Sequence, residues 1–523
     1  MTVTKAPPDP SLRQTPLSIR DVPVAADDPV VRAASTLIGG PIGRYARVGQ
    51  AMGWSAASSA LTLIASLMVA AGLLQKGHCV ANGWHVPDVF WRACYSDLPF
   101  LYAGTPLSNG GFPYGHGVTG TTQPPLTGAV MWLVALLVPS ADMGARQRWF
   151  FMAWAVLTVA LLAMLVRTVA RSSRRDPWRA AHVAASPILI TVALVAPDLL
   201  GVTLAAYGLY LWSRQQPVWA GVLLGLAVAA RTYPILLILV LGMVSLRAGR
   251  IPVWAKTAGT ALLTYVGTLA LLAGVGLATG ALRSVDDVSW MLLPYQQWIN
   301  AGPDYGSLWY LPHVFGVTVG PSITASLTVI GWVLAVLAGA LVTLSAPHRP
   351  TIAEVSLIVV GIVLLTGRSL PVQTALWVLP LLAMTRLRWR DHLIWASCEI
   401  LYFVAIWLYL AGQSDPNRAL PLPWLMFFAT MRLLAVAWLV AMAWRHAWRR
   451  SSADPDPVTA VEEQSGELSL SDLVTAGPQG GNREPRADHD GDPEVLMRDA
   501  AIEPDELAGP LAGRADRMII APV

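Results

Sequence analysis

The sequence contains few charged residues. Asp, Glu, Lys and Arg make up 13% of its 523 residues, 54% are hydrophobic, and the mean hydropathy is +0.52. A soluble chain carries about 25% charged residues and cannot bury so much apolar surface. The composition therefore excludes a soluble enzyme. The 22 Trp, 43 Gly and 39 Pro residues fit a polytopic membrane protein, because Trp gathers at membrane interfaces and membrane helices tolerate Gly and Pro.

Cysteine is also scarce, with three residues in the chain. Cys79 and Cys94 flank one polar loop, and Cys398 lies in an apolar run. Cys79 and Cys94 form a disulfide only if that loop faces an oxidising compartment, and otherwise they are two unpaired thiols. Their spacing does not decide between the two alternatives.

The sequence shows no constellation of metal ligands. Asp286 and Asp287 are adjacent, without an intervening residue, and the histidines of the polar segments are scattered. We therefore expect a reaction that needs neither a metal nor another cofactor.

Charge is distributed unevenly along the chain. Residues 451–523 hold 16 of the 32 acidic residues and five of the 36 basic ones. This acidic, Pro- and Gly-rich stretch is poor in large apolar residues, so we predict a disordered cytoplasmic tail. The basic remainder is explained by arginines at the cytoplasmic ends of membrane spans, and we expect no nucleic-acid partner.

Long apolar runs fill residues 51–450, which we predict to be an all-α transmembrane domain. Residues 1–50 lack apolar periodicity, so we expect a disordered cytoplasmic N-terminus without a cleaved signal peptide. Placing the arginine clusters inside gives about 12 spans with both termini cytoplasmic. The predicted spans are residues 53–74, 149–170, 181–196, 199–212, 218–230, 235–246, 253–279, 322–345, 355–366, 374–384, 393–411 and 425–444.

Two short segments allow more than one topology. Residues 125–138 are too short for the ~30 Å hydrocarbon core, and the arginines after residue 166 must be cytoplasmic, so we predict a juxtamembrane helix on the outer surface. Residues 231–234 fit either a tight outer turn between two spans or a proline kink within one long span.

Glu399 lies in the middle of a predicted span, where a charge is either functional or paired inside the bundle.

The chemistry-bearing side chains cluster in two outer segments, residues 75–148 and 280–321. The string ACYSDLPFLYAGTPLSNGGFPYGHGVTGTTQPPLTG, residues 93–128, resembles the first outer loop of GT-C glycosyltransferases, specifically the polyprenyl-phosphate-mannose-dependent family (glycosyltransferase family 87). In that family a Cys-Tyr-Ser-Asp-(Ile/Leu)-Pro run supplies a carboxylate, and Phe-Pro-Tyr and Glu-Tyr-Pro-x-Leu-Thr-Gly follow it. The order of further short motifs is also similar: residues 198–200, 231–234, 306–310 and 373–380.

The resemblance implies that Asp97 is the general base. Phosphate leaves without protonation by an acid, so one carboxylate acting on the acceptor hydroxyl suffices. The alternative is that Asp97 only caps an interfacial helix.

We expect Arg231 and Arg368 to bind the donor phosphate, because both fall at outer span ends, where the orientation rule disfavours a cation. Snorkelling to lipid headgroups is the alternative for both. The residues expected to contact substrate are Tyr95, Tyr114, Gln123, Tyr233 and Trp309, although aromatic belts form at every membrane interface.

One position departs from the family pattern. The family's Glu-Tyr-Pro is replaced by Gln123, Pro124 and Pro125 here, so a neutral amide stands where the family has a carboxylate. The resemblance therefore leaves the acceptor open.

The sequence thus predicts a multi-pass glycosyltransferase of the plasma membrane with an extracytoplasmic active site. The resemblance implies transfer of a sugar, mannose in that family, with inversion from polyprenyl phosphate to a lipid or glycan acceptor of the cell envelope. Membrane lipids are its other expected partners. The alternative class is a secondary transporter or lipid flippase, which is favoured by the span number but not by the position of the polar residues.

Overall fold

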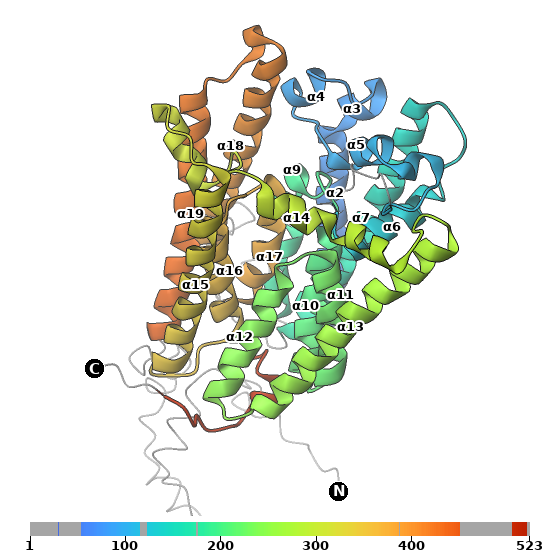
Figure 1. Cartoon of the computed structure of the whole chain (residues 1–523). Helices are drawn as coiled ribbons and strands as arrows, with labels where there is room; N and C mark the ends of the chain where they lie inside the picture. Colours follow the sequence, from blue (N-terminus) through green and yellow to red (C-terminus); the bar gives the residue numbers. More distant parts are fainter. Residues whose placement is uncertain are drawn as a thin grey trace, which may run out of the picture.

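Helices make up all the regular structure in the part of the chain that the computed structural model describes, residues 54–115, 123–173, 176–385, 387–449 and 505–519 together with Val30. Six of these helices are long and apolar enough to cross a membrane. They are α2 (Trp54–Gln75), α7 (Met143–Ser172), α13 (Ile251–Ala278), α15 (Pro321–Ser345), α18 (Trp389–Ser414) and α19 (Leu422–Arg449), and they form the frame of the bundle (Figure 1). The predicted all-α membrane fold is confirmed, whereas the number of 12 spans stays a prediction.

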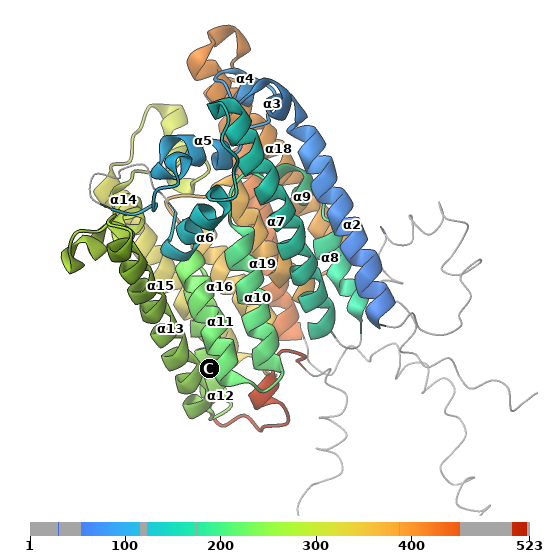
Figure 2. The same cartoon turned by 90° about the vertical axis from the view of Figure 1, so that its right-hand side faces the viewer.

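Five shorter helices account for other predicted spans. They are α10 (Leu199–Ser213), α11 (Pro217–Ala230), α12 (Pro234–Arg247), α16 (Ile352–Thr366) and α17 (Ala375–Met384). At 1.5 Å per residue the longest is about 22 Å, less than a hydrocarbon core. The short helices α10 and α11 therefore end inside the frame, and the outer segments fold above them (Figure 2).

The outer segments form small helical elements. The first contains α3 (Gly77–Asn82), α4 (Asp88–Trp91), α5 (Asp97–Gly104), η3 (Pro106–Asn109) and α6 (Pro125–Ala135), and the second contains η5 (Val285–Leu292), α14 (Leu293–Asn300) and η6 (Leu308–Phe315). The remaining 3-10 elements are η4 (Pro177–Ala180), η7 (Val372–Thr374), η8 (Pro416–Arg418) and η9 (Gly509–Leu511). The predicted helix at residues 125–138 is α6, and its position along the outer membrane surface stays a prediction.

The prediction of one span at residues 181–196 is wrong. This stretch forms two short helices, α8 (Ala181–Ala184) and α9 (Ile188–Val192), followed by turns. Pro187 separates the two helices, since proline is tolerated at a helix start but not in a helix interior. The irregular backbone is buried within the bundle, which is where membrane proteins tolerate it.

Residues 231–234 form a turn between two antiparallel helices, so the tight-turn alternative is confirmed. Arg231 is extended, with φ −154° and ψ 149°, and Pro234 begins α12. The far ends of α10 and α12 both contact the C-terminal segment, through Trp212 and Arg247. Because α11 rises from the end of α10 and α12 returns to that same end, one kinked span is excluded.

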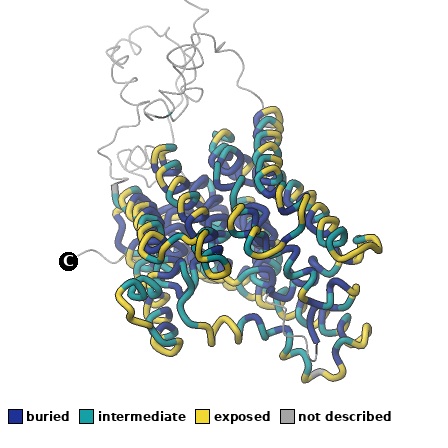
Figure 3. The backbone as a smooth tube through the Cα atoms, turned by 90° about the horizontal axis from the view of Figure 1, so that it is seen from above, coloured by how far each residue is buried: buried dark blue, intermediate teal, exposed yellow. Residues whose placement is uncertain are grey.

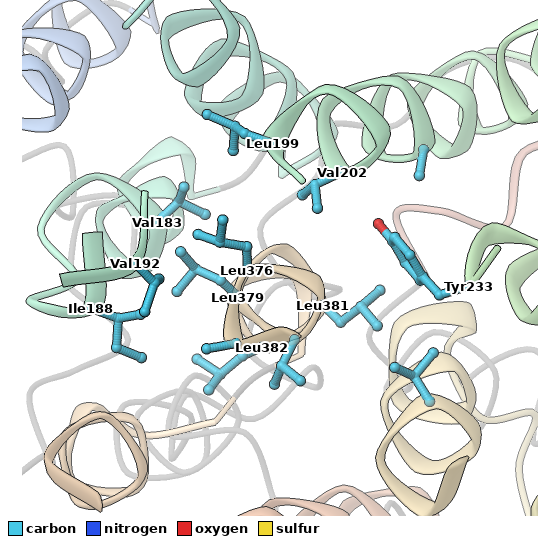
Figure 4. Packing of buried hydrophobic residues seen from close by; sticks show 14 of the residues in the cluster. Val183, Ile188, Val192, Leu199, Val202, Tyr233, Leu376, Leu379, Leu381 and Leu382 are labelled. Carbon is cyan, nitrogen blue, oxygen red and sulfur yellow. The ribbon is translucent and has the colours of Figure 1, made fainter. Parts of the chain in front are cut away.

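Helix α17 lies at the centre of the hydrophobic core. Leu376, Leu379, Leu381 and Leu382 of α17 project toward residues of α8, α9, α10 and the start of α12 (Figure 4). Burial is concentrated in the middle of the bundle, and exposed residues lie on its outward faces (Figure 3). The exposed outward faces of α13 and α15 are rich in Leu, Ile and Val, as expected for helix surfaces that contact lipid.

The end of the chain differs from the predicted disordered tail. Residues 505–519, drawn in red in Figure 1, pack against the end of the bundle that is lowest in that view, which we call its lower end. Leu507 and Leu511 are buried there. Asp516 accepts hydrogen bonds from Arg247 at 2.7 Å and from Arg349 at 2.5 Å, joining α12 to the loop after α15. Residues 1–29, 31–53, 451–504 and 520–523 lie outside the described residues, so the predictions for them are untested.

Replacing the bridging carboxylate should loosen this contact. Asp516→Asn is expected to lower the free energy of unfolding by about 2 kcal/mol, because hydrogen bonds to charged groups contribute about 1.5–3 kcal/mol each. Thermal unfolding of the purified full chain in detergent measures the change. The matched control is Asp286→Asn, an exposed carboxylate in the second outer segment. Equal unfolding temperatures for both variants would show that the Asp516 contacts contribute nothing to stability.

Candidate active site

Asp97 is the first residue of α5, and local backbone contacts fix its position. Ser96 caps the helix by accepting a hydrogen bond from Leu98 N at 3.3 Å, and its hydroxyl donates to Leu194 O at 2.7 Å. The Asp97 N–H donates to Val195 O at 2.7 Å. The break in residues 181–196 thus supplies the free carbonyls that hold the first outer loop.

The Asp97 carboxyl is surrounded by polar and charged side chains. Burial raises its pKa to about 6, a hydrogen bond with Tyr95 opposes this rise, and Asp198 adds to it. Arg231 and Lys76 act in the opposite direction by favouring the carboxylate. A pKa slightly below neutrality suits a general base, because the group is ionised at pH 7 and still accepts a proton readily.

Arg231 is held by Asp198. Its Nη2 donates to Asp198 Oδ2 at 2.7 Å, and the other carboxylate oxygen accepts from Trp377 Nε1 at 2.9 Å. The ring of Trp377 stacks on Tyr233, with centroids 4.8 Å apart. The Nε of Arg231 is buried without a partner among the described residues, so the guanidinium keeps unused donor capacity.

Tyr95 lies in a group of aromatic rings beside Asp97. Its ring contacts Phe90, Phe100 and Trp407, with centroids 5.4, 5.3 and 4.6 Å away. Burial and the charge of Asp97 both raise the pKa of Tyr95, so its hydroxyl stays protonated and donates to the carboxylate. The packed ring restrains the hydrogen bond that orients Asp97.

Tyr114 and Gln123 lie at the start of α6. The Tyr114 hydroxyl is near Gln123 O, Pro124 O and Pro125 O at 3.0, 2.8 and 3.3 Å, so it binds the free carbonyls there. Gln123 is buried, and its Oε1 has no partner among the described residues. Thr127 donates to Ala230 O at 2.8 Å, which brings this end of α6 to the turn that carries Arg231. Tyr114 therefore fixes the backbone at the start of α6, whereas Gln123 Oε1 is a hydrogen-bond acceptor without a partner among the described residues.

Arg368 binds the end of α14. Its Nη1 donates to Trp298 O and Ala301 O at 3.0 and 2.8 Å, and its guanidinium lies over the Trp298 ring at 4.8 Å. Trp309 donates to Thr366 O at 2.8 Å. Both residues thus connect the second outer segment to the loop after α16, and contact of either with a substrate stays a prediction.

The same loop after α16 is held from inside the bundle. Glu399 pairs with Arg432 at 2.7 Å, and both side chains are buried. Arg432 also donates to Leu370 O and to Pro371 O. Glu399 is therefore paired, which was one of its two expected roles.

Cys79 and Cys94 form a disulfide, with a Cα–Cα distance of 5.9 Å. The bond joins α3 to the backbone three residues before Asp97. It closes the loop that Ser96 attaches to the bundle. Within the described residues, no group of three or more His, Cys, Asp or Glu side chains is arranged to hold a metal ion.

Sequence reasoning gave no role to three residues of this site, although Asp198 and Trp377 lie in the motifs at residues 198–200 and 373–380. Lys76 is fully buried, and its Nζ donates to Tyr95 O at 2.9 Å. Asp198 and Trp377 hold the Arg231 guanidinium. A lysine directly after an apolar run usually signals an interface anchor, and the pairing of Asp198 with a residue 33 positions away leaves no local signal.

The fold is that of a polytopic membrane protein in which Lys76, Asp97, Asp198 and Arg231 lie near one another. Residues 122–370 match glycosyltransferase family 87, and no curated protein matches the chain. The match confirms the predicted resemblance to this family, and it indicates a membrane glycosyltransferase. The matched region includes Gln123, Arg231, Tyr233, Trp309 and Arg368 and begins after Asp97.

The contact between Tyr114 and α6 can be tested at Gly128. A Cβ on Gly128 would lie 1.9 Å from the Tyr114 hydroxyl, so Gly128→Ala must displace a buried ring. We expect a loss of stability of about 1–3 kcal/mol, typical of overpacking, together with reduced transferase activity. Gly259→Ala on α13 is the control, since its Cβ would meet no atom within 4 Å. Unfolding temperatures that match the control would contradict the contact.

Proposed function

We propose that the protein transfers a sugar, mannose by family resemblance, from a polyprenyl phosphate to a lipid or glycan acceptor on the extracytoplasmic side of the plasma membrane. The observation that carries this proposal is the Asp97 carboxylate at the start of α5, which is hydrogen-bonded to Tyr95 and favoured in its ionised form by Arg231 and Lys76. One base beside one phosphate-binding cation is the minimum that a single displacement needs.

The distribution of arginines and the disulfide both support an extracytoplasmic active site. The lower end of the bundle, opposite Asp97, carries arginines at many helix ends, including Arg171, Arg214, Arg247, Arg349 and Arg445. Such ends face the cytoplasm under the positive-inside rule. Cys79 and Cys94 form their bond at the other end, and disulfides persist outside the reducing cytosol.

In the proposed step, Asp97 takes the proton of an acceptor hydroxyl. The hydroxyl oxygen forms a bond to the anomeric carbon, and the bond from that carbon to the phosphate oxygen breaks. The electron pair leaves with polyprenyl phosphate, and the anomeric configuration inverts. Arg231 stabilises the phosphate as its charge increases, since arginine presents a planar set of donors to phosphate oxygens.

Asp97→Asn should reduce kcat by about 10²–10⁴, the usual contribution of a general base, without unfolding the protein. The assay incubates purified protein with polyprenyl-phosphate sugars and envelope glycolipids and identifies products by mass spectrometry. Asp88→Asn is the matched control, because Asp88 is an exposed helix-start carboxylate in the same outer segment. Full transfer by Asp97→Asn would remove Asp97 from the mechanism.

Arg231→Ala should weaken binding of the donor and stabilisation of the leaving phosphate. Loss of hydrogen bonds to a charged group costs about 1.5–3 kcal/mol, which corresponds to roughly a 10- to 100-fold lower kcat/KM for the donor. Arg418→Ala is the control, an outer arginine that pairs with Asp88 and lies over Trp91. Unchanged donor kinetics would indicate that Arg231 has only its structural contact with Asp198.

A further inference from the structure

Lys76 is an unusual cation for its position. It follows α2 directly, and its side chain is fully buried. The chain has three lysines among its 36 basic residues, so arginine is by far its commoner cation. Lysine, unlike arginine, changes its pKa readily when it is buried. The protonation state of a buried lysine beside a candidate base therefore depends on the charge of that base.

The contacts of Lys76 lead directly to Asp97. Its Nζ donates to Tyr95 O at 2.9 Å and lies 5.6 Å from the centre of the Phe403 ring. Tyr95 in turn provides the side-chain hydrogen bond to Asp97. Lys76 thus touches the backbone of the residue that orients the carboxylate, and its positive charge favours the ionised form of that carboxylate.

We propose that Lys76 is a positioning residue that fixes the Tyr95 backbone and keeps Asp97 ionised, so that the base is ready at neutral pH. This role rests on the proposed function of Asp97. Lys76 itself neither contacts the substrate nor transfers a proton in the step.

The other charged groups around Asp97 do not keep it ionised in the way that Lys76 does. Asp198 and Arg231 form an ion pair at 2.7 Å, and their effects on the Asp97 pKa are opposite in sign. Tyr95 is neutral and contributes its hydrogen bond. Arg146 of α7 also lies near α5, with its guanidinium over the Tyr102 ring at 5.7 Å. Of the two cations that favour the Asp97 carboxylate, Arg231 is paired with Asp198, and Lys76 is not.

The sign of the effect can be worked out from both groups. Burial raises the pKa of Asp97 to about 6, and the positive charge of Lys76 limits that rise. Burial lowers the pKa of Lys76 to about 7, and the negative charge of Asp97 limits that fall. Removing the ammonium must move the Asp97 pKa upward, and neutralising the carboxylate must move the Lys76 pKa downward.

The first test is the pH profile of kcat/KM for the full-length wild type, Lys76→Met and Lys76→Arg. The wild type should lose activity as the pH falls through about 6. Lys76→Met should move this midpoint upward by about one unit, giving roughly tenfold lower activity on the acid side and recovery at higher pH. Lys76→Arg retains the charge and should retain the wild-type midpoint. An equal loss of activity at every pH, not restored by arginine, would mean that Lys76 is only structural.

A second measurement does not require a Lys76 variant to fold. Selective ¹³C labelling of lysine gives side-chain signals from only three lysines, and Lys5→Arg and Lys256→Arg assign them. The Lys76 pKa should be lower in Asp97→Asn than in the wild type. An unchanged Lys76 titration would overturn the proposed coupling. Full transfer by Asp97→Asn would instead refute the proposed function, so the two failures are distinguishable.

Discussion

Buried charges in the candidate site must be compensated, and this requirement explains which residues lie together there. Lys76, Asp97, Asp198 and Arg231 gather where the short helices end, and Lys76 and Asp198 are almost fully buried. An isolated buried charge is costly, so each must have an opposite charge or hydrogen-bond partners nearby. Arg231 and Asp198 satisfy each other directly, and Lys76 and Asp97 do so through Tyr95. Removing one member would leave another uncompensated, which ties the four residues into one unit.

The bundle makes room for this unit by combining helices of two lengths. The long helices have 22 to 30 residues, whereas α10, α11 and α12 have 14 or 15. The short helices therefore end within the frame of long helices, and the outer segments pack over these ends. The break near residue 195 adds unpaired carbonyls there, and Ser96 and Asp97 bind them.

Sequence alone predicted the class of fold and named several residues of the candidate site. Hydropathy and arginine placement located most helices, and the motif around Asp97 indicated the loop that carries the candidate site. Those signals are local, so they missed contacts made across the bundle, such as Asp198 with Arg231 and Trp377. Residues 505–519 were missed for a related reason. Their packing depends on Asp516 meeting Arg247 and Arg349, which lie more than 160 positions away.

In the proposed reaction, negative charge moves across the site. Asp97 begins as an anion and ends neutral, while a phosphodiester with one charge becomes a phosphate monoester that carries about −1.5 to −2 near neutral pH. Lys76 acts on the side that loses negative charge, and Arg231 acts on the side that gains it. Asp198 already holds one edge of Arg231, so the guanidinium is oriented before the donor arrives and little reorganisation accompanies bond breaking. A responsive cation beside the base and a permanent one beside the leaving group follow from these different demands, because only the Arg231 side needs full positive charge throughout the step.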